Sequence, residues 1–281
     1  MVTEDIKLTY KIGDLEVNRL GYGGMQLTGP GIWGDAEDRE NAIKVLQQAV
    51  ALGVNFIDTA DSYGPLTNEP LIADALYPYN EGLVIATKSG LERPGPDQWV
   101  PNGSPEHIRQ GIEGSLKRLK TDQIDLWQLH RIDPEVPVEE TLQPVIEAVA
   151  AGKIKYVGLS EVTVEQIKQV EAILPLVSVQ NMYNLGDRKW EEVLDYTASQ
   201  GLAFIPWFPL ASGPDAMAEK IKSVAEKHEA TTAQIALAWL LKRSENILLI
   251  PGTKSLTHLE ENLRAADIEL SDEEFELLAR E

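Results

Sequence analysis

The sequence predicts an α/β protein in which parallel strands close into a barrel, and three observations carry this prediction. Short apolar runs, typical of buried strands, alternate with helical patterns along the chain. Three of these runs come just after a glycine that ends a helix, at Gly53, Gly152 and Gly201. A length of 281 residues and an apolar content of 43% suit one α/β barrel with a large core. We therefore expect a single domain over residues 1–281.

The strands follow from local patterns. Residues 8–12 and 15–17 are expected to pair as a hairpin about a turn at Gly13 and Asp14. Because helical patterns separate the later strands, those strands should run parallel with right-handed crossovers. Eight of them are predicted, near residues 19–23, 54–57, 83–87, 124–129, 154–159, 176–180, 202–207 and 247–250.

Capping residues mark several helices. Ser104 and Pro105 predict a helix start, and Thr163 opens a capping box. Pro144 lies inside the helical pattern 139–150, so that helix should begin late or bend. Further helices are expected at 40–52, 215–228, 231–243 and 272–279, of which one before the eighth strand is extra.

Composition excludes several classes of function. The net charge of −20 argues against nucleic acid or an anionic membrane as partner, because both require clustered positive charge. The chain has no cysteine, which excludes disulfides, thiolate catalysis and cysteine metal sites, and we expect no metal site. No secretory signal is visible, and no apolar run approaches the ~18 residues of a membrane span. A cytoplasmic protein, monomeric by default, is expected.

Four polar residues lie just past predicted strands: Asp58, Tyr63, Lys88 and His130. The ends of successive parallel strands meet on one face of a barrel, and barrel catalysis takes place there. When hydride reduces a carbonyl, negative charge builds on its oxygen and a proton must arrive. Tyr63 could donate that proton, with its pKa lowered by the ammonium of Lys88. Asp58 would pair with Lys88, and His130 would orient the substrate oxygen.

Several segments resemble the aldo-keto reductase family over essentially the full length of the chain. They are Asn55 to Gly64, Ala86 to Lys88, Leu126 to His130 and Ile154 to Ser160, in the family's order. The resemblance implies a (β/α)₈ TIM barrel with an N-terminal β-hairpin covering its bottom. It also implies that Tyr63 is the proton donor, helped by Lys88, Asp58 and His130.

The same resemblance implies a nicotinamide cofactor. It implies that Ser160 and Gln180 hold the carboxamide, although Glu161 stands where the family usually has asparagine, and a carboxylate cannot donate as an amide does. Trp207 would stack on the nicotinamide, and Gly24 and Met25 would lie beside the cofactor. Leu210 and Ser212 belong to a loop that would run along the pyrophosphate.

A phosphate corner follows the eighth predicted strand. The resemblance implies that this corner binds the adenosine phosphate and that Glu261 and Asn262 contact adenine. Lys254 could supply charge, and His258 stands where many members have an arginine. NADPH is therefore favoured over NADH. The residues assigned to the corner are Thr253, Lys254, Ser255, His258, Glu261 and Asn262.

The expected activity is that of an NADP-dependent carbonyl reductase or alcohol dehydrogenase, an oxidoreductase acting on small aldehydes or ketones. Met25, Trp33, Trp99 and Trp127 are candidates for the walls of an open substrate site. Two alternatives stay open. One is a cofactor-binding regulatory subunit of the same fold with slow turnover. The other is an unrelated barrel that uses Lys88 for a Schiff base.

Overall fold

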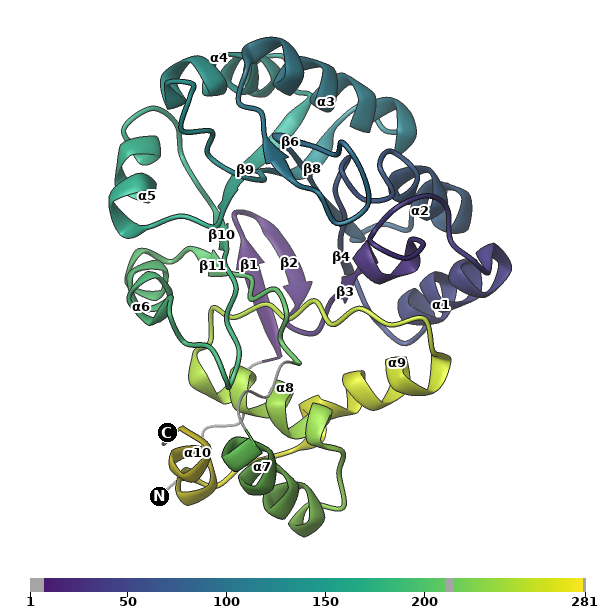
Figure 1. The fold of residues 1–281 in the computed structure, drawn as a ribbon, viewed down its shortest axis with the longest axis vertical. Helices are drawn as coiled ribbons and strands as arrows, with labels where there is room; N and C mark the ends of the chain where they lie inside the picture. The colour runs from purple at the N-terminus through teal and green to yellow at the C-terminus, as the bar shows by residue number, and fades with distance from the viewer. Residues whose placement is uncertain (1–7, 211–214, 280–281) are drawn as a thin grey trace.

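The computed structural model describes residues 8–210 and 215–279, and its centre is a ring of parallel strands (Figure 1). Seven strands form one curved sheet in the order β11-β10-β9-β8-β5-β4-β3, and every neighbouring pair is parallel. In chain order they are β3 (Tyr22–Gly23), β4 (Phe56–Asp58), β5 (Val84–Ser89), β8 (Ile124–Leu129), β9 (Ile154–Ser160), β10 (Ser178–Gln180) and β11 (Ala203–Phe204).

The eighth predicted strand, near residues 247–250, closes this sheet into a barrel. It pairs in parallel with both edges through single bridges, Phe204 with Ile247 and Leu20 with Leu249. The amide N of Leu248 donates to the carbonyl O of Phe204 at 2.8 Å, and the amide of Gly21 donates to Leu249 at 2.8 Å. The segment near residues 247–250 is thus joined to each edge of the sheet through one or two residues, and not through a long ladder of backbone hydrogen bonds. The (β/α)₈ barrel prediction is confirmed.

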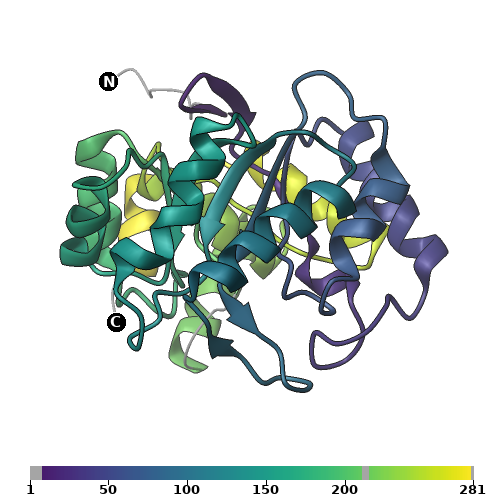
Figure 2. The same cartoon turned by 90° about the horizontal axis from the view of Figure 1, so that it is seen from above.

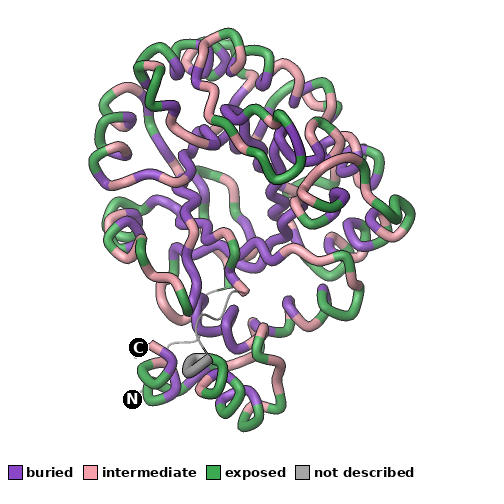
Figure 3. The backbone as a smooth tube through the Cα atoms, viewed as in Figure 1, coloured by how far each residue is buried: buried purple, intermediate pink, exposed green. Residues whose placement is uncertain are grey.

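Ten α-helices of the described chain surround the ring, and their inward faces are buried (Figures 1 and 3). Both α7 and α8 lie between β11 and the closing segment, as predicted for the extra helix. The bounds are α1 (Arg39–Ala51), α2 (Asn68–Leu76), α3 (Pro105–Arg118), α4 (Val138–Ala150), α5 (Val164–Glu171), α6 (Glu191–Gln200), α7 (Asp215–Lys227), α8 (Thr232–Arg243), α9 (Leu256–Leu263) and α10 (Asp272–Ala279), with 3₁₀ turns η1 (Gly24–Leu27) and η2 (Arg264–Asp267).

The predicted caps are present. Of the two outcomes expected from Pro144, a late start or a bend of α4, the late start is wrong. Ser104 Oγ accepts from the amide of His107 before α3, and Thr163 forms a capping box before α5. Helix α4 begins at Val138 and continues past Pro144. Pro144 lies beyond the first turn, so it does not prevent that turn from forming, although it removes its own N–H and its ring crowds the carbonyl of Glu140. Pro144 is buried, and burial on the barrel stabilises the segment.

The N-terminal hairpin closes one end of the barrel, as predicted. Its strands β1 (Thr9–Ile12) and β2 (Leu15–Asn18) are antiparallel. Ile12 and Val17 are fully buried against the apolar side chains that fill the barrel, including Phe56. A second hairpin, β6 (Leu91–Glu92) with β7 (Val100–Pro101), was not predicted and lies at the opposite end (Figure 2).

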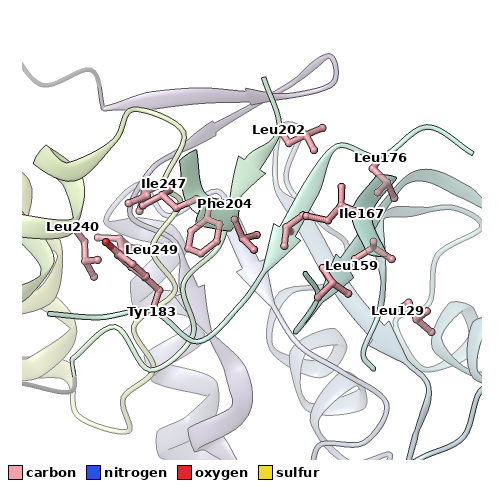
Figure 4. Close-up of a cluster of buried hydrophobic side chains, with 14 of the residues drawn as sticks. Leu129, Leu159, Ile167, Leu176, Tyr183, Leu202, Phe204, Leu240, Ile247 and Leu249 are labelled. Carbon is pink, nitrogen blue, oxygen red and sulfur yellow. The ribbon is translucent and has the colours of Figure 1, made fainter. Parts of the chain in front are cut away.

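A larger apolar layer lies between the strands and the helices around them. Figure 4 shows part of it, where Leu159 of β9, Phe204 of β11 and Ile167 of α5 are buried. Trp127 belongs to this layer and has no exposed surface, so its suggested place in a substrate wall is wrong. Among the described residues, no helix is both long and apolar enough to cross a membrane.

Candidate active site

The four strand-end residues converge at the barrel end that carries the β6–β7 hairpin. Asp58 ends β4, Lys88 lies near the end of β5, and His130 follows β8 directly. Tyr63 comes from the turn after β4. All four are almost fully buried. Tyr63, Asp58 and His130 line a cavity of about 780 Å³, so the sequence correctly identified the residues that meet here.

A buried ion pair forms the base of the site. Lys88 Nζ donates to Asp58 Oδ1 at 2.5 Å, to the carbonyl of Thr59 at 2.8 Å and to Tyr63 Oη at 3.2 Å. Burial alone would lower the pKa of Lys88, but Asp58 and Tyr63 outweigh it and the pKa is raised. The ammonium therefore stays charged, with all three donors engaged.

Two glutamines hold the other carboxylate oxygen of Asp58. Asp58 Oδ2 accepts from Gln180 Nε2 at 2.9 Å and from Gln128 Nε2 at 3.2 Å. Because both oxygens of the carboxylate are engaged, its orientation is set before any ligand binds. Because Lys88 donates to this carboxylate, the position of its ammonium is fixed as well.

Tyr63 is positioned to donate a proton into the cavity. Its oxygen accepts from Lys88, which leaves the phenolic hydrogen available for another acceptor. Its pKa is raised, because burial outweighs the lowering effect of Lys88, whose charge Asp58 offsets. Lys88 lowers the pKa of Tyr63 as predicted, but burial has the larger effect, so the net pKa lies above its ordinary value. The phenol is protonated at neutral pH, as an acid must be.

His130 is a neutral hydrogen-bonding group. Burial, followed by the cations Lys88, Arg131 and Arg93, lowers its pKa well below the ordinary value. Its Nδ1 lies 3.2 Å from Ser62 Oγ, and its ring is 5.9 Å from that of Tyr63. A neutral ring whose Nδ1 accepts from Ser62 carries its proton on Nε2. Such a ring can hydrogen-bond a substrate oxygen without competing as an acid.

Most residues assigned to the nicotinamide end of the cofactor share this cavity. Met25, Ser160, Gln180, Trp207 and Leu210 line it together with Asp58. Gly24 does not line the cavity itself, but it lies between Gly23 and Met25, which both do. A Cβ on Gly24 would come within 2.6 Å of Asn68 Oδ1. Ser212 lies outside the described residues.

Glu161 takes a role that the sequence did not reveal. Its Oε1 accepts from Trp207 Nε1 at 2.7 Å and from the amide of Met182 at 2.5 Å. Its backbone is left-handed, with φ at 54°. Because the carboxylate is turned toward the indole N–H, it holds the tryptophan in place instead of lining the cavity. This explains why an acid can replace the usual asparagine.

Arg131 was missed by sequence reasoning and lines the same cavity. Its Nη1 donates to the carbonyl of His130 at 2.6 Å and to Ser160 Oγ at 3.0 Å. The signal was present in the sequence, since a cation directly follows the strand-end histidine. A strand-end arginine is usually solvated, so its burial could not be foreseen.

The phosphate corner lies beside this cavity without lining it. It follows Gly252, which does line the cavity, and leads into α9. Ser255 Oγ accepts from the amide of His258 at 3.3 Å and so caps α9. Lys254 Nζ lies 3.4 Å from Glu37 Oε2 at the surface. Glu261 is half-buried and Asn262 is buried, while Thr253 accepts from Tyr22 through its carbonyl.

The unpredicted hairpin supplies the outer wall. Trp99 lines the cavity, with its ring 6.4 Å from Tyr63 and 6.3 Å from His130. The guanidinium of Arg93 lies 3.6 Å from the Trp99 ring centroid and donates to backbone carbonyls that include Ser62. Arg93 thereby ties the hairpin to the loop of the catalytic tyrosine candidate. Trp33 stacks more loosely on Arg93 at 5.7 Å.

Comparison with known proteins shows which family this chain is similar to. The model of the "Aldo/keto reductase family" matches residues 19–280. An uncharacterised oxidoreductase of Schizosaccharomyces pombe is 52% identical, over 97% of this chain and 89% of that protein. Pyridoxine 4-dehydrogenase of Escherichia coli is 42% identical, over 94% of this chain and 95% of that protein.

Solved structures agree with these sequence relatives. The thermostable aldo-keto reductase Tm1743, in complex with the inhibitor epalrestat, superposes with a TM-score of 0.86 at 31% identity, covering 97% of this chain and 99% of that one. An aldo-keto reductase from Klebsiella pneumoniae in complex with NADPH gives a TM-score of 0.82 at 26% identity, covering 97% and 94%.

Proposed function

The chain belongs to the aldo/keto reductase family of oxidoreductases, and from this premise we propose that it reduces aldehydes or ketones to alcohols with NADPH. In reverse it would act as an alcohol dehydrogenase. Tyr63 would be the general acid, with Lys88, Asp58 and His130 as its partners.

One observation carries the proposal: the chain of contacts from Asp58 through Lys88 to Tyr63 at the wall of the cavity. Lys88 donates to the phenolic oxygen, so it stabilises the phenolate that remains when the proton leaves. Asp58 keeps the ammonium charged and in place. A neutral His130 can hydrogen-bond the carbonyl oxygen beside the phenol and align it for proton transfer.

The donor set around the cavity fits the nicotinamide end of a dinucleotide. Ser160 and Gln180 offer a hydroxyl and an amide, which suit a carboxamide, and Trp207 offers an aromatic face. Gly23 and Gly252 bring two backbones together, since a Cβ on Gly252 would lie 2.7 Å from the carbonyl of Gly23. When bound, NADPH would supply the hydride to the carbonyl carbon.

We propose NADPH over NADH because of the phosphate corner. Lys254 is exposed beside the capped start of α9, where a phosphate would meet both the ammonium and helix amides. The Klebsiella pneumoniae relative of the same fold was crystallised with NADPH. The preference is expected to rest on the ammonium of Lys254.

The substrate class is proposed from the walls of the cavity. Trp99, Trp207, Phe208 and Leu91 provide aromatic and aliphatic surface around a few polar groups. One relative is named pyridoxine 4-dehydrogenase, and pyridoxine is an aromatic alcohol. We therefore propose small aromatic aldehydes, and the corresponding alcohols, as the substrates.

The test is consumption of NADPH or NADH in the presence of a panel of aromatic aldehydes and ketones, followed by absorbance. Turnover with NADPH and slower turnover with NADH are expected. Quenching of tryptophan fluorescence on titration with each cofactor reports binding separately, because Trp207 lies in the cavity. Tight NADPH binding without turnover of any substrate would instead favour a cofactor-binding regulatory subunit.

A Schiff-base mechanism at Lys88 has little support. Its pKa is raised and its three donors are engaged by Asp58, Thr59 and Tyr63, whereas a nucleophilic lysine must be uncharged.

A further inference from the structure

We propose that Arg131 selects the substrate, and that the preferred substrates are small aldehydes carrying an anionic oxygen, as a carboxylate or phenolate, on the same ring system. The inference rests on the proposed function and gives it a narrower substrate class. Arg131 would contact the substrate without taking part in proton transfer, because a guanidinium does not lose its proton near neutral pH.

Arg131 presents a fixed cationic fork to the cavity. It directly follows His130 and lines the same space as Tyr63. Its Nη1 donates to the His130 carbonyl at 2.6 Å and to Ser160 Oγ at 3.0 Å, which fixes the orientation of the planar group. Neither Nε nor Nη2 donates to any described residue, so these N–H groups are available to a ligand.

The charge of Arg131 is not matched inside the cavity. It is the one lysine or arginine among the described residues that line this space. The charge of Lys88 is matched by Asp58 at 2.5 Å, and His130 is neutral. The carboxylate of Glu161 is the opposing charge that acts most strongly on Arg131, but it forms no ion pair with Arg131 and does not line the cavity.

A second acid at the rim does not cancel this charge. Asp97 also lines the cavity, but it is exposed and its field acts on Arg93. Exposed charges are screened by water, whereas a charge on the cavity wall acts through a less polar medium. Arg131 is therefore the cation that a ligand in the cavity would meet directly.

An anionic substrate would give Arg131 a direct ion-pair partner, which it lacks among the described residues. Burial lowers the pKa of Arg131, which shows that its charged form is held at a cost. A guanidinium fork matches a carboxylate in a bidentate pair, and such charge-assisted bonds are stronger than neutral ones. Arg131 directly follows His130 and lines the same cavity as Tyr63, so an anion held by Arg131 would lie near the reacting carbonyl.

The experiment compares substrates that have nearly the same shape and differ in charge. We would measure kcat/KM with NADPH for 3- and 4-carboxybenzaldehyde and for the corresponding formylbenzamides. The wild-type enzyme is expected to prefer at least one carboxylate by about 10- to 100-fold, the range of a charge-assisted hydrogen bond. Arg131→Gln should remove that preference, so that the ratio of kcat/KM for the carboxylate to kcat/KM for the amide falls by about 10- to 100-fold. Arg131→Lys should retain part of it.

Arg109→Gln is the matched control, because it removes the same charge from an exposed residue on α3 that pairs with Glu147. It should leave both classes of substrate unchanged. A wild-type enzyme that does not distinguish carboxylates from amides would overturn the inference. So would an equal loss for both classes in Arg131→Gln, or a weakened affinity for NADPH with an unchanged substrate ratio, which would assign Arg131 to the cofactor.

A direct binding measurement keeps the inference testable if Arg131→Gln fails to fold. Benzoate should bind the wild-type protein at least about tenfold more tightly than benzamide. Equal binding would contradict the inference. If no aldehyde is reduced while benzoate is still preferred, the proposed function fails and the anion site stands.

Discussion

The two lysines that the sequence places near the cofactor lie in opposite electrostatic environments. Lys88 pairs with Asp58 at 2.5 Å, and the two side chains are 0% and 2% exposed. Lys254 lies 3.4 Å from Glu37, with side chains 46% and 65% exposed. The first pair is bound by further hydrogen bonds and cannot rearrange without loss. The second is a surface contact, which typically contributes at most ~1 kcal/mol.

This difference matches the different roles proposed for the two sites. The group that moves a proton must be aligned to within a fraction of an ångström, so it is assembled in the core before ligand arrives. A phosphate needs only positive charge and amide donors, which solvated side chains can provide on binding. Under the proposed function, the end that would transfer the proton is preorganised, whereas the proposed phosphate corner would adjust to its ligand.

The sharpest test of the preorganised centre is Tyr63→Phe. Removing the hydroxyl leaves Lys88 and Asp58 paired but takes away the proton donor, so kcat should fall by about 10²- to 10⁴-fold. The affinity for NADPH, measured by tryptophan quenching, should change little. A variant that keeps most of its turnover would show that another group supplies the proton.

Lys88→Met should mainly reduce stability. It leaves the Asp58 carboxylate buried without its cation, which should lower the free energy of unfolding by about 3 to 5 kcal/mol in urea denaturation. The double variant Lys88→Met/Asp58→Asn removes both charges and should recover much of this loss. If the single and double variants are equally destabilised, the ion pair is not what makes Lys88 necessary.

Asp61 is a buried carboxyl in the same loop as Tyr63. Among the described residues, no cation lies within hydrogen-bond distance of it. Its Oδ1 has no hydrogen-bond partner, and burial together with the carboxylate of Glu69 raises its pKa to about 7. Because the pKa of Asp61 is higher in the folded protein than in the unfolded chain, Asp61 contributes stability at pH values below its unfolded pKa of about 3.9. This contribution is lost as the pH rises through about 7.

The Asp61→Asn variant should therefore be more stable than wild type at pH 8 by about 1 to 3 kcal/mol, and similar to it at pH 4. Urea unfolding at the two pH values measures both differences. An advantage of the variant that is the same at both pH values would mean that Asp61 does not titrate as inferred.

The smallest effect is expected at the phosphate corner. Lys254→Gln should weaken NADPH binding by about 5- to 10-fold and leave NADH binding unchanged, with the difference shrinking at high salt. Glu37→Gln is the control at the other end of the surface pair and should change NADPH affinity by less than about twofold. Equal losses for both cofactors would place Lys254 away from the 2′-phosphate.

Local sequence patterns were sufficient to predict the barrel and to identify the candidate catalytic residues. Strand ends are visible in the sequence as apolar runs that stop at a polar residue, as at Asp58 and His130. Parallel strands bring such ends to one face, so convergence follows from topology alone. The hairpin at residues 91–101 was missed because its two-residue strands carry almost no periodic signal.

Errors arose wherever the answer depended on which way a side chain points. Trp127 and Gln128 are neighbours in β8, yet the first lies in the outer apolar layer and the second holds Asp58. The sequence placed Glu161 where the family usually has asparagine, but it did not show that the carboxylate contacts Trp207. Neither contact joins residues close in sequence, so neither leaves a local pattern.

The sequence by itself determined which residues end the strands, and hence that a phenol, an ammonium, a carboxylate and an imidazole would meet. The reason is that hydrophobic periodicity is a local property, and the ends of parallel strands collect in one place. Only the tertiary structure decided the charge of each group and its direction. Burial raises the pKa of Tyr63 against the pull of Lys88, and the packing leaves Arg131 at the cavity wall with no ion-pair partner among the described residues. Desolvation depends on every atom packed around a group, and those atoms come from all parts of the chain.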